Sequence, residues 1–587
     1  MKKILFIILL VLSFNALKSQ EQKSTVDSLQ IAGLCKVWGL IKYYHPDVTK
    51  KKIDWDNILI QKYPEFKSKN DFESYNRKLI ELVDTLSQAK NAKKVNKDLY
   101  NKIVGDKIES LDNFKCLSDT SKYINRISFS WINDDLFSKE TKYKLCEILV
   151  NYKAYESKDL KGRLRVRHIE NKFEELDSIT EPYRILALFR YWNTINYYFP
   201  YKHLSDHNWN TVLVGAIPKM IRANTYLDYT WQLQSLSSKI NDSHGFYECF
   251  NRKYFKKSKA GNKSKPQRRG YIPYNFRLID NQIIVSDVLI DSAVLNRGDT
   301  ILKINDRNLK SYPDSYYKYY SHSTKQSAIY HCEAELSRYY GTEFIFKLLK
   351  NKDTISLKET KLIGHERKFE YKFKHRKPPF YSSINDKAGY IDLTQVTFGK
   401  FKKAIRTFKN KEAVVFDLRG YPETMVVFAL AHLLGNEKKD VARYYYPNKK
   451  YPGTYINAKN PQHIRFGFVK PFLLFQKPYK GNMIVLIDAS TMSQTETFGM
   501  MFKAYADDVT FVGIPTAGAN GDVSTIYLPG GIAFNFSSLD WHYPDGSQLQ
   551  RIGIIPDIIV KESAEDLITG KDIIFERAIQ YIENNFN

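Results

Sequence analysis

The chain has 587 residues, which by length alone predicts roughly three or four domains. Hydrophobic residues make up 43% and charged residues 26%, as in ordinary globular proteins, which excludes a collagen-like, low-complexity or fully disordered chain. The single long apolar run lies at the N-terminus, which excludes a polytopic membrane protein. The net charge of +26 comes from lysines spread along the whole chain, so we expect no nucleic-acid partner.

The N-terminus has the pattern of a secretory signal peptide. Lys2 and Lys3 form a positive region, residues 4–12 form a short apolar stretch, and the small Ser19 offers a cleavage point. We therefore expect residues 1–19 to be removed and the protein to be exported, to the periplasm or the extracellular space. An uncleaved segment would instead anchor the chain in a membrane. The five cysteines form neither a disulfide framework nor a zinc-ligand spacing.

Two related helical units are predicted next. Residues 34–46 read LCKVWGLIKYYHP and residues 188–200 read LFRYWNTINYYFP, and the match continues without a gap for over fifty residues at an offset of 154. Apolar residues in the matched stretch recur at helical spacing. We assign residues 20–165 and 166–255 to two helical repeat units, with the shared aromatic residues in their core.

The second unit differs from the first at its end. There the sequence NDSHG places Ser243 and His244 where the first unit has Ala89 and Lys90. A Ser-His pair that occurs in only one copy of a duplicated scaffold is a candidate for function. From this segment alone, a core or capping role of both residues is favoured over a functional one.

A basic stretch and a β-rich region follow the repeats. Residues 256–270 are rich in lysine, glycine, serine and proline, which is typical of a linker. Residues 294–305 read VLNRGDTILKIN, a Gly-Asp turn followed by an apolar strand. This pattern resembles PDZ domains, and we place a PDZ-like domain at residues 271–360. An unrelated β-rich module is the alternative.

The C-terminal part alternates between strands and helices. Buried strands are predicted at residues 388–393, 413–416, 483–487 and 509–512, and an amphipathic helix at residues 398–408. Such βαβ units predict a parallel sheet that binds ligands at the carboxyl ends of its strands. At one of these ends, Ser493 lies between a strand and a helix that begins near Gln494.

Ser493 is placed where a nucleophile would be effective. The first N–H groups of a helix are unpaired, and the helix dipole stabilises an oxyanion there. Ser493 and Glu496 also match a capping box, so this segment alone does not separate a nucleophile from an N-cap.

Four motifs, in this order, resemble the tail-specific, or C-terminal-processing, serine peptidase family. They are DLRG at residues 417–420, TMSQTE at 491–496, TAGANG at 516–521 and GIIPD at 553–557. The resemblance implies a multidomain α+β protein with an α/β, ClpP/crotonase-like catalytic domain at residues 361–565 and a C-terminal helix at residues 566–587. It also implies that Ser493 is the nucleophile, that the substrates are proteins or peptides, and that no cofactor or metal is needed.

The general base is expected to be a histidine. The processing peptidases use a lysine in the loop that corresponds to TAGANG, and this loop contains no lysine here. A sister branch, which resembles the core protease of the tricorn complex, uses a histidine from a Ser-His pair upstream of the PDZ domain. Ser243 and His244 match that pair in type and order. We therefore expect His244 to act as general base, with Ser243 and Gln550 orienting it.

Two departures from the family leave an inactive protein possible. Gln550 stands where the tricorn-like branch has a carboxylate, so Gln550→Glu is expected to preserve or raise activity. Glu423 and Thr424 replace a Gly-Gly pair of the oxyanion hole, which their N–H groups would form together with that of Gln494. The sequence thus predicts an exported serine endopeptidase or, alternatively, an inactive peptide- or ligand-binding member of the same fold.

Two other polar clusters are interpreted as structural. His203, Asp206 and His207 have metal-like spacing, but the first repeat lacks them, so we expect a solvated loop. Asp417 and Arg419 follow a buried strand, where an ion pair or a turn is expected rather than catalysis.

Overall fold

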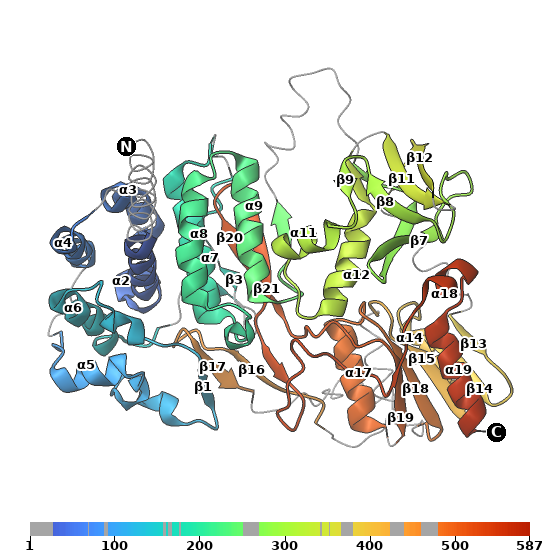
Figure 1. The fold of residues 1–587 in the computed structure, drawn as a ribbon. Coiled ribbons are helices and arrows are strands. Elements are labelled where there is room, and N and C mark those ends of the chain that lie inside the picture. Colours follow the sequence, from blue (N-terminus) through green and yellow to red (C-terminus); the bar gives the residue numbers. More distant parts are fainter. Residues whose placement is uncertain are drawn as a thin grey trace, which may run out of the picture.

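The computed structural model describes residues 28–67, 70–86, 92–155, 160–161, 167–168, 170–174, 176, 178–249, 269–340, 343–350, 353–364, 380–422, 440–458, 479–506 and 508–586. The predicted signal segment, most of the predicted linker, and Glu423 and Thr424 lie outside the described residues. The protein is a mixed α+β chain with helices at one side, a six-stranded sheet at the other and a β-rich region above that sheet (Figure 1). No helix within these ranges combines the length and apolarity needed to cross a membrane.

The N-terminal region contains two sets of matched helices. In the first set, helical residues 28–44 precede α3 (Trp55–Lys67) and α4 (Phe72–Asp84). In the second, α7 (Glu181–Tyr198) precedes α8 (Trp209–Arg222) and α9 (Tyr226–Ser237). The first set is completed by α2 (Pro46–Thr49), α5 (Lys97–Val104) and α6 (Lys139–Val150).

Matched tryptophans join the helices of each set by the same pair of hydrogen bonds. The indole N–H of Trp38 donates to the carbonyl of Trp55 at 3.4 Å, and that of Trp55 donates to the carbonyl of Trp38 at 3.0 Å. Trp192 and Trp209 repeat this exchange at 2.8 and 3.1 Å. Each buried indole therefore has a partner for its N–H, as burial of a polar group requires.

Two small sheets connect the helical region with segments from the far end of the sequence. One sheet has the order β2 (Leu160–Lys161), β3 (Arg167–His168), β20 (Val523–Leu528), β21 (Ile532–Ser537) and β4 (Tyr247–Cys249). The other has the order β1 (Tyr123–Asn125), β17 (Thr454–Asn457), β16 (Arg443–Pro447) and β22 (Asp540–His542). Because α9 leads into β4, the segment that carries His244 ends beside β21.

Residues 269–364 contain an antiparallel sheet and two helices. The sheet order is β12 (Asp353–Glu359), β11 (Phe344–Lys350), β8 (Thr300–Ile304), β7 (Gln282–Val288) and β6 (Tyr274–Ile279), and β9 (Arg307–Asn308) pairs with β8. The helices are α11 (Tyr312–Tyr319) and α12 (Lys325–Leu336), and β5 (Arg269–Tyr271) pairs with β10 (Arg338–Tyr340). We call residues 269–364 the β-rich region; that it is a PDZ-like domain stays a prediction.

The C-terminal part contains a six-stranded sheet that is parallel except at one edge. Its order is β13 (Tyr381–Ser383), β14 (Ala388–Asp392), β15 (Ala413–Asp417), β18 (Asn482–Ile487), β19 (Val509–Gly513) and β23 (Ile558–Ile559), with β13 antiparallel. The four buried strands predicted from the sequence are confirmed within one or two residues.

Helices cover both faces of this sheet. On one face lie α14 (Phe398–Phe408), whose apolar residues Phe401, Ala404 and Phe408 are buried, and α17 (Gln494–Tyr505). On the other face lies α19 (Ile573–Asn585). The C-terminal segment forms two helices rather than one, because Gly570 ends α18 (Ala564–Thr569) with a φ of +68° that favours glycine.

Arg419 fastens α19 to the end of β15. Its guanidinium donates to the buried Asp417 at 2.7 and 3.0 Å and to Asp572, the N-cap of α19, at 2.6 and 2.7 Å. The hydroxyl of Tyr390 donates to the same Asp417 at 2.9 Å. The DLRG motif thus forms a structural ion-pair network at the strand end, as the sequence led us to expect.

We expect Arg419→Met to lower the free energy of unfolding by about 3–5 kcal/mol, because it leaves the Asp417 carboxylate buried without its cation. Urea unfolding followed by circular dichroism measures this loss. Arg577→Met, which removes an exposed arginine of α19, is the control and should change the free energy of unfolding by less than about 0.5 kcal/mol. A similar small loss for both variants would contradict this role of Arg419.

Candidate active site

Ser493 forms a strained turn between β18 and α17. Its backbone has φ 60° and ψ −120°, a region that residues other than glycine rarely occupy. Many N-caps of this chain are extended, for example Asp71 with φ −65° and ψ 169° and Ser138 with φ −64° and ψ 160°. Glu496 accepts the Ser493 N–H at 3.3 Å, as in a capping box, but the backbone of Ser493 is not that of an ordinary cap. Strain of this kind is typical of functional positions.

Two threonine hydroxyls attach this turn to the end of β15. Thr491 donates to the carbonyl of Leu418 at 3.0 Å, and Thr495 donates to the carbonyl of Gly420 at 2.9 Å. Both threonines are fully buried. The DLRG motif therefore ends directly beside the Ser493 turn, three residues before Glu423.

Glu496 fixes the TAGANG loop to the same turn. The buried carboxylate accepts hydrogen bonds from the Thr516 hydroxyl at 2.6 Å and from the N–H groups of Gly518 and Ala519 at 2.8 and 3.1 Å. Burial raises the pKa of Glu496 to about 7, and these hydrogen bonds act in the opposite direction. The Ser493 N–H also donates to the Ala519 carbonyl at 2.9 Å. The loop contains no lysine, and Glu496 on α17 is the side chain that joins it to Ser493.

We expect Glu496→Gln to lower the free energy of unfolding by roughly 1–3 kcal/mol, because an amide NH₂ would face donors that need an acceptor. Denaturant unfolding measures the change. Glu576→Gln on α19 serves as control, since it removes the charge of a glutamate without these four donors and should have little effect. Equal stability of both variants and the parent protein would show that the Glu496 hydrogen bonds contribute nothing.

His244 is held by a buried chain of hydrogen bonds. Its side chain is only 3% exposed, and its Nδ1 lies 2.8 Å from the hydroxyl of Ser537 at the end of β21. That hydroxyl donates to Asp242 at 2.9 Å, so it must accept the proton of Nδ1. The tautomer with a protonated Nδ1 leaves an unprotonated lone pair on Nε2, as a general base requires.

Asp242 is the centre of this network. Its carboxylate also accepts the backbone N–H groups of Ser537 at 2.6 Å and of His244 at 3.1 Å. Burial lowers the pKa of His244, and the negative charges of Asp242 and Asp522 partly offset that effect. His244 therefore stays neutral to lower pH than a free imidazole.

The structure brings Gln550 into the network but places Ser243 beside it. The Gln550 amide donates to Asp242 at 3.2 Å and to Ser323 at 3.3 Å. The Ser243 hydroxyl lies 2.9 Å from that of Ser327 and accepts the Ser323 N–H at 2.9 Å. Ser243 thus attaches the turn to the β-rich region. Ser243 was expected to orient His244, but the hydroxyl that bonds the His244 ring is that of Ser537.

The TAGANG loop and its continuation link the Ser493 turn with the hydrogen-bond network of His244. At one end the Ala519 carbonyl accepts the Ser493 N–H, and Asp522, three residues later, is close enough to influence His244. Three residues of extended chain span at most about 11 Å. The carbonyl of Gly518 accepts the N–H of Arg551, next to Gln550, at 2.8 Å.

The sequence reasoning missed Asp242 and Ser537. Asp242 carried a signal, because it lies two residues before His244 and within the segment that the first repeat lacks. Ser537 carried none, since it lies almost 300 residues further along the chain and reaches His244 only through the pairing of β21 with β4.

The metal-like cluster around His203 has other contacts. The Nδ1 atom of His203 lies 3.1 Å from the carbonyl of Pro200, and Asp206 pairs with Arg551 at 2.8 and 2.9 Å. Within the described ranges, no group of three or more His, Cys, Asp or Glu side chains is arranged to hold a metal ion. Four cysteines in those ranges, Cys35, Cys116, Cys146 and Cys332, are free thiols.

Comparisons with known proteins point to one family. Residues 387–560 match the sequence profile of peptidase family S41. Mature CPAF is similar in structure, with 14% identity and a TM-score of 0.51 over 70% of this chain and 99% of CPAF. A mutant of CPAF gives 13% identity and a TM-score of 0.52 over the same shares of the two chains. The photosystem II D1 C-terminal processing protease gives 12% identity and a TM-score of 0.36, over 66% of this chain and 98% of the protease. No curated protein sequence matches the chain.

Proposed function

We propose that the chain is a serine-type peptidase of family S41, whose profile matches residues 387–560, with Ser493 as its nucleophile and His244 as its general base. The observation that carries this proposal is the hydrogen-bond chain from Asp242 through Ser537 to Nδ1 of His244, because it leaves Nε2 free to accept a proton. The strained backbone of Ser493 is a second, independent support.

The reaction then follows the usual course of acyl transfer. Nε2 of His244 takes the hydroxyl proton of Ser493 while Oγ attacks the scissile carbonyl, and the imidazolium returns the proton to the leaving amine. A water molecule, deprotonated by the same nitrogen, hydrolyses the acyl-enzyme and regenerates the serine. The N–H of Gln494, at the start of α17, is proposed to stabilise the oxyanion together with those of Glu423 and Thr424.

Asp242 is proposed to supply the negative charge that Gln550 lacks. Through Ser537 it holds the ring and stabilises the imidazolium, as the carboxylate of a catalytic triad does directly. This revises the expectation for Gln550→Glu. A second carboxylate would lie against Asp242, whose oxygen is 3.2 Å from the Gln550 amide, so the substitution should lower activity.

Export and peptide binding complete the proposal. Residues 1–19 have the signal pattern described above, which supports action in the periplasm or outside the cell. The β-rich region is proposed to be PDZ-like and to bind extended peptides by strand addition at an edge of its antiparallel sheet. The proposed use of histidine rather than lysine would place the protein in the tricorn-like branch.

We expect Ser493→Ala and His244→Ala each to lower the rate of hydrolysis of a fluorescently labelled denatured protein by about 10³–10⁶-fold, with no further loss in the double variant, because both residues act in one unit. Ser490→Ala, in the same turn, and His203→Ala are the controls and should keep most of the activity. Near-full activity of His244→Ala, together with loss on replacing a lysine, would contradict the mechanism. No hydrolysis by the parent protein would favour the inactive, peptide-binding alternative.

We expect Asp242→Asn to lower kcat by about 10²–10⁴-fold, because the amide cannot stabilise the imidazolium. In the parent protein the acid limb of the pH profile should lie below the ordinary pKa of histidine, since burial lowers the pKa of His244. Asp242 raises that pKa, so its removal should move the acid limb to still lower pH. An unchanged acid limb, or one that moves to higher pH, would contradict the assignment of Asp242.

A further inference from the structure

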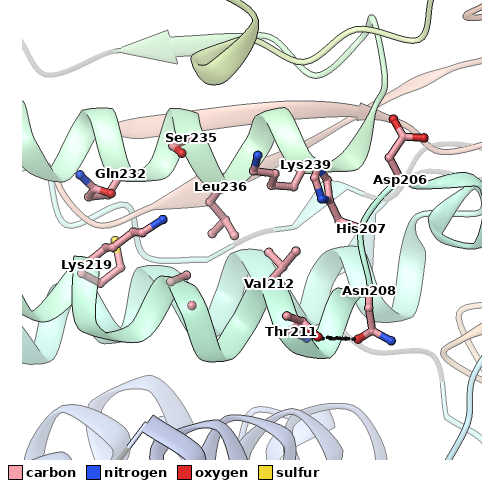
Figure 2. A pocket seen from close by; sticks show the side chains of 13 residues that line it. Asp206, His207, Asn208, Thr211, Val212, Lys219, Gln232, Ser235, Leu236 and Lys239 are labelled. Carbon is pink, nitrogen blue, oxygen red and sulfur yellow. Dashed lines mark hydrogen bonds between the residues drawn. The ribbon is translucent and has the colours of Figure 1, made fainter. Parts of the chain in front are cut away.

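A groove lies between α8 and α9, away from the hydrogen-bond network around His244. It has a volume of about 340 Å³, and its floor is apolar, with Val212, Ala216 and Met220 from α8 and Leu236 from α9. Figure 2 shows Val212 and Leu236 pointing toward each other between the two helices, and Lys219 and Lys239 on opposite sides of the groove.

The lysines of the groove have no carboxylate to neutralise them. In the described part of the chain neither Lys219 nor Lys239 forms an ion pair. Burial lowers the pKa of Lys239, and the positive charges of Lys219 and Lys318 lower it further. The acid at the rim, Asp206, is already bound by Arg551 at 2.8 and 2.9 Å. The groove thus combines an apolar floor with uncompensated positive charge.

Gly215 points to a ligand independently of the charge. It lies inside α8, where glycine costs roughly 0.5–1 kcal/mol relative to alanine. A Cβ atom at this position would meet no other atom within 4 Å, and no positive φ requires glycine here. The packing of the described chain therefore does not need a glycine at 215, whereas a ligand lying close against the helix backbone would need the space.

We propose that this groove binds an acidic segment of an extended polypeptide substrate, with carboxylates between Lys219 and Lys239 and an apolar side chain on the floor. A second copy of this chain fits poorly, because the net charge of +26 would place positive charge against positive charge. The inference deepens the proposed function, since it gives the peptidase a binding site for substrate outside the catalytic residues.

The groove is attached to the catalytic network at two places. The helix α9 continues through the turn that contains Lys239 into Asp242 and His244. At the rim, Asp206 pairs with Arg551, which directly follows Gln550 in the sequence. A peptide held in the groove is therefore bound to the same body that carries the general base, which would raise the local concentration of an acidic substrate near the site.

Fluorescence anisotropy tests the proposal with the full chain carrying Ser493→Ala. The probe is a rhodamine-labelled peptide that alternates glutamate and leucine, compared with the same peptide containing glutamine. We expect the glutamate peptide to bind. The double variant with Lys219→Gln and Lys239→Gln should raise the Kd of this peptide by about tenfold or more, and added salt should raise the Kd for the unsubstituted groove. Gly215→Leu should block the groove without unfolding the helix, while Gly215→Ala should have a smaller effect. The matched control replaces the exposed Lys403 and Lys409 by glutamine and should leave binding unchanged.

Several outcomes would overturn the proposal. Equal binding of the two peptides, no binding, or no effect of Gly215→Leu and the double lysine variant would each do so. Full competition by inorganic phosphate would show a site for small anions instead. A failure of this proposal can be distinguished from a failure of the proposed function. The chain with Ser493 intact should hydrolyse a short neutral peptide whether or not the groove binds acidic segments, because that reaction does not involve the groove lysines.

Discussion

The Asp242 carboxylate is the interaction on which the rest of the site depends. It is fully buried and accepts hydrogen bonds from two N–H groups, one hydroxyl and one amide, contributed by His244, Ser537 and Gln550. These donors come from three segments that are separated by up to three hundred residues of chain. A buried carboxylate is tolerated only when its hydrogen bonds are satisfied, so this cluster forces the three segments together. The orientation of His244 follows from the same bonds.

The fold meets this requirement by interleaving its parts. Strand β21 pairs with β4, which begins three residues after His244, and β20 pairs with β21 and β3. Ser323 and Ser327 hold Ser243 from the β-rich region. The β-rich region therefore supports the turn that carries His244, the proposed base, and is also a proposed peptide-binding region. Glu496 has a similar role at Ser493, because it joins the Ser493 turn to the loop that ends near Asp522.

The sequence predicted best where the determinants are local. The strands of the C-terminal sheet and the helix α14 follow from short apolar patterns, and their bounds were predicted closely. The Ser493 turn was found because strand, turn and helix succeed one another within fifteen residues. The sequence could not show that Ser537, rather than Ser243, bonds the His244 ring. This contact depends on the long-range pairing of β21 with β4, which leaves no periodic signal in the sequence. Gln550 was interpreted as a lost charge, since nothing in the local sequence shows that Asp242 is its partner.

The central claim is that Ser493 is a nucleophile activated by His244. A fluorophosphonate probe reacts covalently with activated serines, and peptide mass spectrometry locates the modified residue. The account predicts one adduct, on Ser493, that forms in the parent protein and forms far more slowly in His244→Ala at neutral pH. Absence of an adduct on the folded parent protein, an adduct on another serine, or an unchanged rate in His244→Ala would contradict it.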